Sequence, residues 1–370
     1  MEGLGGIILF NNIYQNRKVL VTGHSGFKGS WLVLWLQQMG ANVSAISLPP
    51  STSPNHWDLL NINIDSHYLD IRDEQKLRKN ILKINPEIVF HLAAQPLVLA
   101  SYQRPLDTWS TNVLGTANVL DACRELKKLS AIVVVTTDKC YENKEWVWSY
   151  REIDPLGGND PYSASKASSE LVAKSYRQSF FNTDNGPLLA TARAGNVIGG
   201  GDWSEDRIVP DLVRATVTKK PLLVRSPYAT RPWQHVLECL SGYLALGEKL
   251  LSQNKIFADA WNFGPNNDSH RTVEELLISM KLKWPDIAWQ LSSAAQGHKH
   301  HEANLLQLDS SKARSILAWR PVWSFEECVA KTAEWYQNWI SKGEIIGQRQ
   351  LKEYVAAAKN KKIEWSEERK

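Results

Sequence analysis

A glycine-rich turn between a strand-like and a helix-like run constrains the fold of this chain more than any other feature. Residues 18–22 form a short run of β-type character, Gly-His-Ser-Gly-Phe-Lys-Gly occupies 23–29, and the apolar stretch 31–39 has the pattern of a helix. A second strand-like run follows at 42–47. This order predicts a βαβ unit, in which the two strands lie parallel in one sheet and a helix crosses over between them.

The same alternation continues along the first 200 residues and predicts an α/β fold. Strand-like runs recur at 88–93, 131–137 and 188–194, a shorter one precedes Asp70, and helices are predicted at 112–126 and 162–180. This rhythm is typical of a Rossmann-type, doubly wound parallel sheet. Past residue 199 the pattern changes to a smaller mixed C-terminal lobe, with helices predicted at 210–219, 236–251, 272–284 and 325–340 and a short strand at 222–225.

We expect two lobes and a tail. The nucleotide-binding lobe spans 16–200 and is rejoined by 233–264, while 201–232 and 265–340 form the substrate-binding lobe. Residues 341–370 have the pattern of a charged amphipathic tail, and 293–304 that of a polar, His-rich surface loop. Within that loop His298, His300 and His301 lack carboxylates at ligand spacing, so no metal site is expected.

Composition excludes several classes of protein. An apolar fraction of 43% and a charged fraction of 22% are those of a soluble globular chain. The net charge of +4 is mild and its basic residues are scattered, so nucleic acid is not an expected partner, and no apolar stretch is long enough to span a membrane. The four cysteines lack CxxC spacing, which predicts reduced thiols and a cytoplasmic location. The 16 tryptophans more commonly pack than stack on ligands.

The glycine turn is a candidate cofactor site. Gly23, Gly26 and Gly29 let backbone amides approach a pyrophosphate at the N-terminus of the following helix. Phe27 belongs to the same turn, and Lys28 either contacts phosphate or faces water. The second strand ends in Ser-Leu-Pro-Pro, with neither an acid for the ribose hydroxyls nor an arginine for a 2′-phosphate, so NAD is only weakly favoured over NADP.

Three further positions are candidate cofactor contacts. Asp70, with Ile71 beside it, stands where a carboxylate accepts a hydrogen bond from an adenine amino group, although a helix N-cap is the alternative. The small side chains in Leu92-Ala93-Ala94 let a flat cofactor lie across the edge of the sheet. Asn112 either caps the next helix or positions an active-site lysine.

Two short strings carry the candidate chemistry. Tyr162 and Lys166 are four positions apart, so they share one face of a helix, and the ammonium can lower the phenol's pKa from about 10 toward working pH. Tyr162 is therefore a candidate base. Thr137, Asp138 and Lys139 follow an apolar run, and this acid and amine could remove and deliver the elements of water. A plain alcohol dehydrogenase does not need them.

The strings resemble the extended short-chain dehydrogenase/reductase family, whose members modify nucleotide sugars with a tightly held NAD. The similarity covers about residues 17–340 and is carried by the runs 23–31, 137–146, 192–203 and 231–236. Within the family these runs are similar to nucleotide-sugar 4,6-dehydratases, with CDP-glucose as the implied substrate. The resemblance implies a lobe with seven parallel strands, a smaller lobe that grips the nucleotide sugar, and a homodimer or dimer of dimers.

The resemblance also implies roles for the catalytic residues. Tyr162 would deprotonate the sugar's 4-hydroxyl while hydride leaves C4, Lys166 would bind the nicotinamide ribose, and Thr137 would bond the 4-oxygen. Asp138 would protonate the departing 6-hydroxyl and Lys139 would be the base at C5, where dTDP-glucose dehydratases carry a glutamate. Lys139 must be neutral and Asp138 protonated for these roles, and the sequence leaves open which of the two holds the proton.

Substrate contacts are assigned to the edge between the lobes. Asn196 after the sixth strand would meet the diphosphate, and Arg207 and Arg231 are its expected cationic partners because an arginine fork matches phosphate geometry. The alternatives are a nucleotide-sugar 4-epimerase, which needs no acid and base at 138 and 139, a dehydratase for another nucleotide sugar, and a non-catalytic NAD-bound scaffold.

Overall fold

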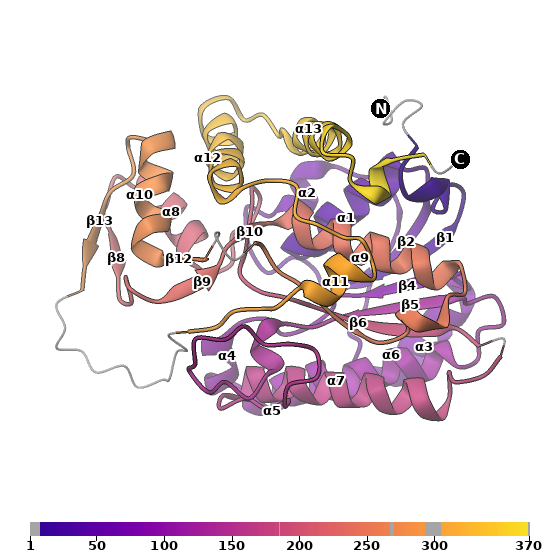
Figure 1. Cartoon of the computed structure of the whole chain (residues 1–370). Coiled ribbons are helices and arrows are strands. Elements are labelled where there is room, and N and C mark those ends of the chain that lie inside the picture. The colour runs from indigo at the N-terminus through magenta and orange to yellow at the C-terminus, as the bar shows by residue number, and fades with distance from the viewer. Residues whose placement is uncertain (1–7, 185, 267–269, 293–304, 369–370) are drawn as a thin grey trace.

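A computed structural model describes residues 8–184, 186–266, 270–292 and 305–368 (Figure 1). Its centre is a seven-stranded sheet in the order β11-β6-β5-β4-β1-β2-β3, with every pair of neighbours parallel. The strands are β1 Lys18–Thr22, β2 Asn42–Ser47, β3 Asp65–Tyr68, β4 Ile88–His91, β5 Ala131–Val135, β6 Leu188–Ala194 and β11 Ala260–Phe263. The predicted doubly wound parallel sheet is confirmed.

Helices cover both faces of this sheet, because its strands are apolar on both sides. Along β1, Val19 and Val21 pack into the core shared with α1 and α9, while Leu20 packs into the core shared with α3 and α6. The bounds of the helices around the sheet are α1 Phe27–Gln38, α2 His56–Leu60, α3 Glu74–Ile84, α4 Val98–Gln103, α5 Pro105–Trp109, α6 Gly115–Cys123, α7 Pro161–Ser179 and α9 Val236–Leu251.

The remaining elements lie mostly past residue 195 and form the mixed part of the fold. Three two-stranded sheets pair β10 with β7, β12 with β9 and β13 with β8. Their strands are β7 Val197–Ile198, β8 Leu222–Val224, β9 Thr230–Pro232, β10 Gln234–His235, β12 His270–Thr272 and β13 Trp289–Leu291, and the helices are α8 Ile208–Val217, α10 Val273–Lys283, α11 Ser311–Ser315, α12 Phe325–Lys342 and α13 Gly347–Asn360. Strand β11 returns to the main sheet beside β6, which supports the proposed lobe boundaries.

Two helix predictions differ most from the structure at their ends. The helix predicted at 31–39 begins at Phe27, because Gly26 has extended backbone angles and ends the turn there. The helix predicted at 112–126 is instead part of a run from α5 through a π-helical turn, η2 Ser110–Leu114, into α6. Turns of this π type disturb the regular spacing of a helix and cluster at functional sites.

The segment predicted as a charged tail is folded. Helix α13 packs on α1, and the side chains of Tyr354 and Trp365 are buried against Trp35. Its charged face is exposed while its apolar face completes the core, which fits the predicted amphipathic pattern and shows that the segment is part of the folded body. In Figure 1 α13 lies beside α1 and α12, at the top of the view.

Other expectations from composition can be compared with the structure. All four cysteines are free and buried, and eleven of the 16 tryptophans are buried, which fits a packing role for the indoles. No described helix is both long enough and apolar enough to cross a membrane. The described residues contain no cluster of His, Cys, Asp and Glu suited to a metal ion, and the 298–301 histidines lie outside the described residues.

Candidate active site

One large cavity, of about 1440 Å³, runs along the carboxyl ends of β1, β4, β5 and β6 and on toward α8 and β9. Every sequence-predicted site residue except Asn112 lines it: Gly23, Gly26, Phe27, Lys28, Gly29, Asp70, Ile71, Leu92, Ala93, Ala94, Thr137, Asp138, Lys139, Tyr162, Lys166, Asn196, Arg207 and Arg231. Ligands of doubly wound folds bind at this edge of the sheet. The structure thus brings the proposed cofactor, catalytic and substrate residues into one space.

The glycine turn forms a cradle in which side chains have no room. Gly23 has φ +81°, and a Cβ built on it would lie 2.7 Å from the backbone nitrogen of Ala93. A Cβ on Gly29 would lie 2.1 Å from the carbonyl oxygen of Gly23. At Gly23 and Gly29 the turn therefore consists of backbone alone. It packs against the end of β4 and lies at the N-terminus of α1. This geometry fits a pyrophosphate.

Asp70 is held by an arginine and caps no helix. The Arg72 guanidinium bonds both its carboxylate oxygens, with Nη2 2.6 Å from Oδ2, and this pairing lowers the pKa of Asp70. The N-cap of α3 is Asp73, which accepts a bond from the Lys76 amide. The alternative assignment of Asp70 as an N-cap is therefore wrong, and its carboxylate faces the cavity edge in ionised form.

Asn112 neither lines the cavity nor caps a helix. Its Oδ1 accepts a bond from the Gln95 amide at 2.8 Å, and its Nδ2 donates to Ser165 Oγ at 2.9 Å. The side chain thus joins the loop after β4 to α7 from within the π-helical turn. The prediction of direct cofactor contact is corrected, because the turn directs this amide into the protein between two segments that border the site.

Tyr162 and Lys166 are positioned by the first turns of α7. Asp160 caps the helix by accepting a bond from the Ser163 amide, and the Tyr162 amide donates to Ser101 Oγ of α4. Lys166 extends to the end of β5, where its Nζ donates to the carbonyl of Val135 at 3.2 Å. Both side chains are buried and both border the cavity.

Burial sets the protonation of both groups. It lowers the pKa of Lys166 to about 8, helped by the nearby charge of Lys28, and it raises the pKa of Tyr162 to about 12. An interaction with Thr137 lowers the phenol's pKa, but desolvation is the larger effect. The expectation that Lys166 brings this pKa toward neutrality is therefore not met.

Asp138 is an almost fully buried carboxyl group, and one of its two oxygens has no hydrogen-bond partner among the described residues. It is 2% exposed and sits in a single 3₁₀ turn, η3 Asp138–Cys140, directly after β5. Its Oδ1 accepts a bond from the Thr137 hydroxyl at 2.9 Å, whereas Oδ2 has no partner among the described residues. Burial raises the pKa of Asp138, although the charges of Lys139 and Arg231 oppose this. The geometry therefore favours a protonated acid.

Lys139 contrasts with its neighbour. Its side chain is half-buried and borders the cavity, and within the described part of the chain it makes no hydrogen bond or ion pair. The turn is fixed instead by its backbone, since the Lys139 amide donates to the Thr137 hydroxyl at 3.3 Å. The Lys139 side-chain nitrogen is therefore available to a ligand in the cavity.

The substrate candidates line the same cavity as the catalytic candidates, and the charges of Arg231 and Arg207 lower the pKa of Asp138 and of Tyr162, respectively. Arg231 of β9 is buried and donates to the carbonyl of Thr230 at 2.9 Å. Arg207, at the N-terminus of α8, forms an ion pair with Asp202 at 3.0 Å. Asn196 is half-buried between β6 and β7, and its carbonyl accepts a bond from the Gln234 amide. The three come together around one space, although Arg207 already has an anionic partner.

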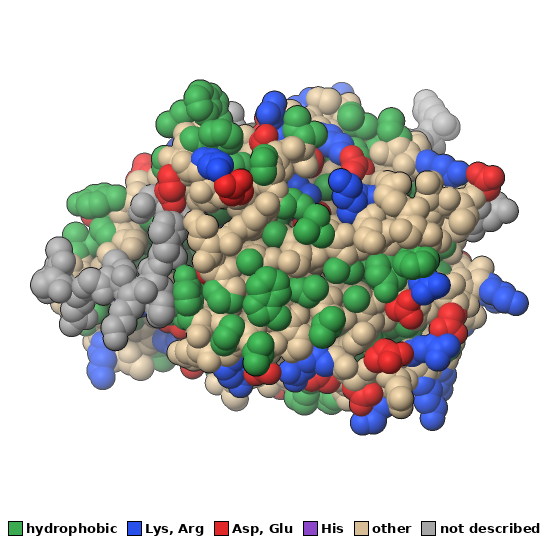
Figure 2. Space-filling view, turned by 90° about the horizontal axis from the view of Figure 1, so that it is seen from below, with side chains coloured by type: hydrophobic (Ala, Val, Ile, Leu, Met, Phe, Trp, Pro, Cys, Tyr) green, Lys and Arg blue, Asp and Glu red, His purple; other side chains and the backbone are tan. Residues whose placement is uncertain are grey.

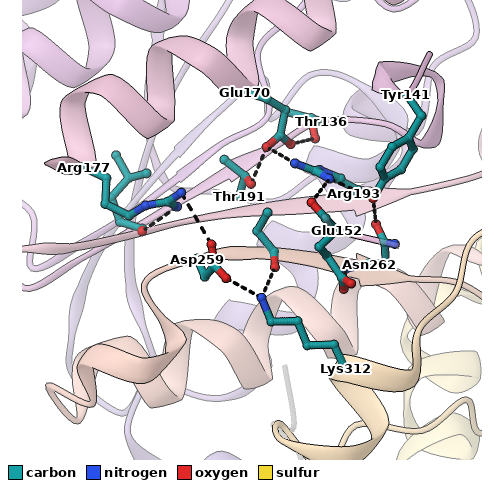
Figure 3. Close-up of polar contacts among 12 residues, drawn as sticks. Thr136, Tyr141, Glu152, Glu170, Arg177, Thr191, Arg193, Asp259, Asn262 and Lys312 are labelled. Carbon is teal, nitrogen blue, oxygen red and sulfur yellow. Dashed lines mark hydrogen bonds and ion pairs between the residues drawn. The ribbon is translucent and has the colours of Figure 1, made fainter. Parts of the chain in front are cut away.

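The sequence analysis missed an ion pair behind the catalytic residues (Figure 3). Glu170 and Arg193 are each 3% exposed, and Arg193 Nη2 lies 2.8 Å from Glu170 Oε2. Thr136 and Thr191 also donate to this carboxylate. The signals were present: Glu170 stands one helical turn after Lys166, and Arg193 interrupts the apolar run of β6, where a charge requires a partner.

The chain is similar to known nucleotide-sugar dehydratases and epimerases along most of its length. A family profile described as GDP-mannose 4,6 dehydratase matches residues 20–332. CDP-glucose 4,6-dehydratase of Salmonella typhimurium is 47% identical over 357 residues, which cover 94% of this chain and 98% of that protein. UDP-glucose 4-epimerase of Mycoplasma pneumoniae is 23% identical, over 88% of this chain and 98% of that protein.

The fold has close counterparts among solved structures. The epimerase Mth375 of Methanothermobacter thermautotrophicus superposes with a TM-score of 0.77 at 23% identity, over 89% of this chain and 95% of that one. At this identity the structural similarity establishes the fold alone. The profile match and the 47% identical relative also establish the family to which the chain belongs. The chain belongs to the GDP-mannose 4,6 dehydratase family, within the extended short-chain dehydrogenases/reductases.

Proposed function

We propose that the protein converts CDP-D-glucose to CDP-4-dehydro-6-deoxy-D-glucose and water, as an NAD-dependent hydro-lyase. The carrying observation is that Asp138 and Lys139 face the same cavity as Thr137, Tyr162 and Lys166. The first two provide for elimination and the other three for redox chemistry. The 47% identity to a CDP-glucose 4,6-dehydratase supports this dehydration and this nucleotide. The product would feed deoxysugar synthesis for surface polysaccharides such as lipopolysaccharide.

Residues along the sheet edge would hold the cofactor. The bare turn at Gly23, Gly26 and Gly29 accepts the pyrophosphate, Asp70 lies where an adenine amino group would donate, and Lys166 would bind the nicotinamide ribose. Bound in this place, NAD would supply the oxidant for C4 of the sugar and, in its reduced form, the hydride for C6. The small side chains of Ala93 and Ala94 leave the end of β4 open for it.

The protein's own groups would move the protons. Tyr162 takes the proton of the 4-hydroxyl, and the interaction with Thr137 and the charge of Arg207 favour the phenolate that this step requires. Thr137 bonds the 4-oxygen. Once C4 is a ketone, the C5 proton is acidic, so Lys139 in its neutral form removes it and gives it back to C5 when hydride reaches C6. Asp138, which burial holds toward its protonated form, gives its proton to the departing 6-hydroxyl.

Incubation of the purified protein with CDP-glucose tests this proposal. The expected result is a product with a new near-ultraviolet band in alkali, because dehydrated keto-sugars enolise there. A panel of CDP-, dTDP- and GDP-sugars assigns the nucleotide. Turnover of dTDP-glucose with none of CDP-glucose would overturn the CDP assignment and leave the dehydration intact.

A 4-epimerase is the second candidate, since the fold is shared with epimerases and Tyr162, Lys166 and Thr137 serve both reactions. An epimerase has no use for the enclosed acid Asp138. Formation of CDP-galactose in place of a dehydrated product would favour it. A non-catalytic scaffold is disfavoured, because none of the five catalytic positions has lost its functional group.

A homodimer would form through the face that carries α5 and α7. Exposed apolar side chains gather there: Leu106 is 81% exposed, Leu114 61% and Leu171 56%. Figure 2 views the molecule from this side and shows hydrophobic side chains collected over the middle of the face. Monomers rarely expose a large apolar patch without a partner. A second copy would build a four-helix bundle here.

Light scattering tests this interface. The unmodified chain is expected to be a dimer or a dimer of dimers at micromolar concentration, and Leu171→Glu to be a monomer because it places a charge in the apolar contact. Ile153→Glu changes an exposed apolar residue outside these helices and serves as the control. A monomeric unmodified chain would refute the interface. For location, we propose the cytoplasm, where reduced cysteines persist.

A further inference from the structure

A buried ion pair lies directly behind the catalytic residues and takes no part in the chemistry described above. Glu170 belongs to α7, one turn beyond Lys166, and Arg193 belongs to β6. Figure 3 shows the two side chains pointing toward each other between the helix and the sheet. A buried pair of this kind contributes little net stability compared with apolar residues of the same size. Its presence beside an active site calls for another explanation.

The carboxylate of Glu170 connects three chain segments. One oxygen accepts a bond from the Thr136 hydroxyl, at the end of β5 and immediately before Thr137. The other accepts from Thr191 at 2.7 Å and from Arg193 at 2.8 Å, both on β6. Burial alone would raise the pKa of Glu170, but Arg193 and these bonds hold it below its usual range, so the group is ionised.

Arg193 extends the connection to the segment that follows η3. Its Nη1 donates to the Tyr141 hydroxyl at 2.8 Å, and Tyr141 in turn donates to Asn262 Oδ1 of β11 at 2.7 Å. Tyr141 stands two residues after Lys139. The Thr137-Asp138-Lys139 segment is therefore tied to the ion pair at both ends, through Thr136 on one side and Tyr141 on the other.

We propose that Glu170 is a positioning residue: through Thr136 and Arg193 it fixes α7 against the ends of β5 and β6, and so fixes the two catalytic segments relative to each other. Tyr162 and Lys166 move with α7, whereas Asp138 and Lys139 move with the end of β5. Hydride transfer and elimination act on neighbouring carbons of one sugar, so the two segments must keep a fixed position relative to each other. This inference rests on the proposed function.

Glu170 also acts on Lys166 through its charge. The groups facing Lys166 are Lys28 from α1, Glu170 from α7, Cys140 from η3 and His91 from β4. Burial and Lys28 lower the pKa of Lys166, while Glu170 opposes them. The ammonium form of Lys166 is required to bind the ribose. Loss of the Glu170 carboxylate would therefore lower the pH at which Lys166 loses its proton and this contact.

Two matched variants separate positioning from general stability. Thr136→Val and Thr191→Val each remove one hydroxyl that donates to Glu170, the first from the catalytic strand end and the second from the interior of β6. We expect Thr136→Val to lower kcat about 30-fold with KM little changed, on the scale of a sub-ångström misplacement. Thr191→Val should remain within about twofold. Equal effects of the two, or no effect of either, would overturn the proposal.

Glu170→Gln tests the charge with a readout that needs no turnover. NAD⁺ affinity, followed by quenching of tryptophan fluorescence, should fall as pH rises through the pKa of Lys166. In Glu170→Gln the midpoint should move down by about one pH unit, because an opposite charge has been removed. An unchanged midpoint in folded protein would contradict the inference, and if this variant fails to fold, the threonine pair decides.

Arg177→Gln is the control for the helix as a whole. Arg177 joins α7 to the carbonyl of Leu189 and to Asp259, away from the catalytic end (Figure 3). It should change neither kcat nor the midpoint. If the unmodified protein binds NAD⁺ but turns over no CDP-glucose, the proposed substrate fails, and the threonine variants are compared on the nucleotide sugar that does react.

Discussion

The two halves of the proposed catalytic site are built in different ways. The redox half, Tyr162 and Lys166, stands on a 19-residue helix whose first turn is capped by Asp160 and bonded to Ser101. The elimination half, Asp138 and Lys139, stands on a three-residue 3₁₀ turn. Lys166 is bonded to the protein, whereas Asp138 Oδ2 has no partner among the described residues. The helix holds its groups in place. The turn leaves an oxygen of Asp138 and the side-chain nitrogen of Lys139 without partners in the described part of the chain, so that both can bond a substrate.

This difference matches the two kinds of chemistry that we propose for the site. Hydride transfer needs a fixed base and a fixed ribose contact, which a long, packed helix provides. Elimination needs an acid that retains its proton near neutral pH, and the enclosed turn provides it by desolvation. A buried, incompletely bonded carboxyl group costs stability, so its presence points to function.

The largest expected effect is at the redox half. Tyr162→Phe removes the base while keeping the ring, and we expect kcat to fall about 10⁴-fold, the upper range for a general base. Substrate binding should persist, which isothermal titration with CDP-glucose can verify. Residual turnover near the unmodified rate would mean that another group takes the 4-hydroxyl proton.

Asp138→Asn separates the two halves. Without the acid, elimination should slow about 10³-fold, while oxidation at C4 continues and the near-ultraviolet absorbance of reduced nicotinamide accumulates on the protein. Stopped-flow absorbance follows this accumulation. Intact turnover would mean that elimination is not the chemistry of this site.

Glu238 sharpens the comparison, because it is buried like Asp138 but bonded at both oxygens. It accepts bonds from the amides of Val322 and Trp323 and from the Tyr354 hydroxyl. Burial raises its pKa from 4.5 to about 7. The folded state therefore binds this proton more tightly than the unfolded state, so the unfolding free energy falls as pH rises from about 4.5 to 7.

The expected loss is about 3 kcal/mol across that window and levels off above pH 7. In Glu238→Gln this contribution to the slope should vanish, even though Gln satisfies the two amides less well. Urea denaturation at pH 5 and pH 8 measures the difference for both proteins. An equal slope in the variant would show that Glu238 titrates normally.

The smallest expected effect is the alkaline limit of activity. The pKa of Lys166 is lowered to about 8 by burial and by Lys28. The ammonium is present below this value and is lost above it, so kcat should fall about tenfold per pH unit above pH 8. In Lys28→Met the limit should shift to higher pH, because a repelling charge is gone. An unshifted profile would exclude Lys28 from this effect.

Much of the fold could be predicted because buried parallel strands need uninterrupted apolar runs. The predicted bounds of β1, β2, β6 and α9 match the structure to the residue. The position of the site followed in the same way, since the ends of parallel strands meet at one edge. The role of Asn112 and the packing of the C-terminal segment could not be predicted in this way. The direction of a side chain in a π-helical turn, and the burial of an amphipathic helix, depend on which elements pack against them.

The sequence by itself determined the βαβ order and the glycine turn, and it was enough to propose the five catalytic side chains, because strand patterns and functional groups are local properties. Only the tertiary structure decided which groups are charged. The pKa values of Tyr162 and Lys166 depend on burial by residues far away in the chain. The Glu170–Arg193 pair likewise joins positions that are distant in sequence, and only folding brings that carboxylate behind the site.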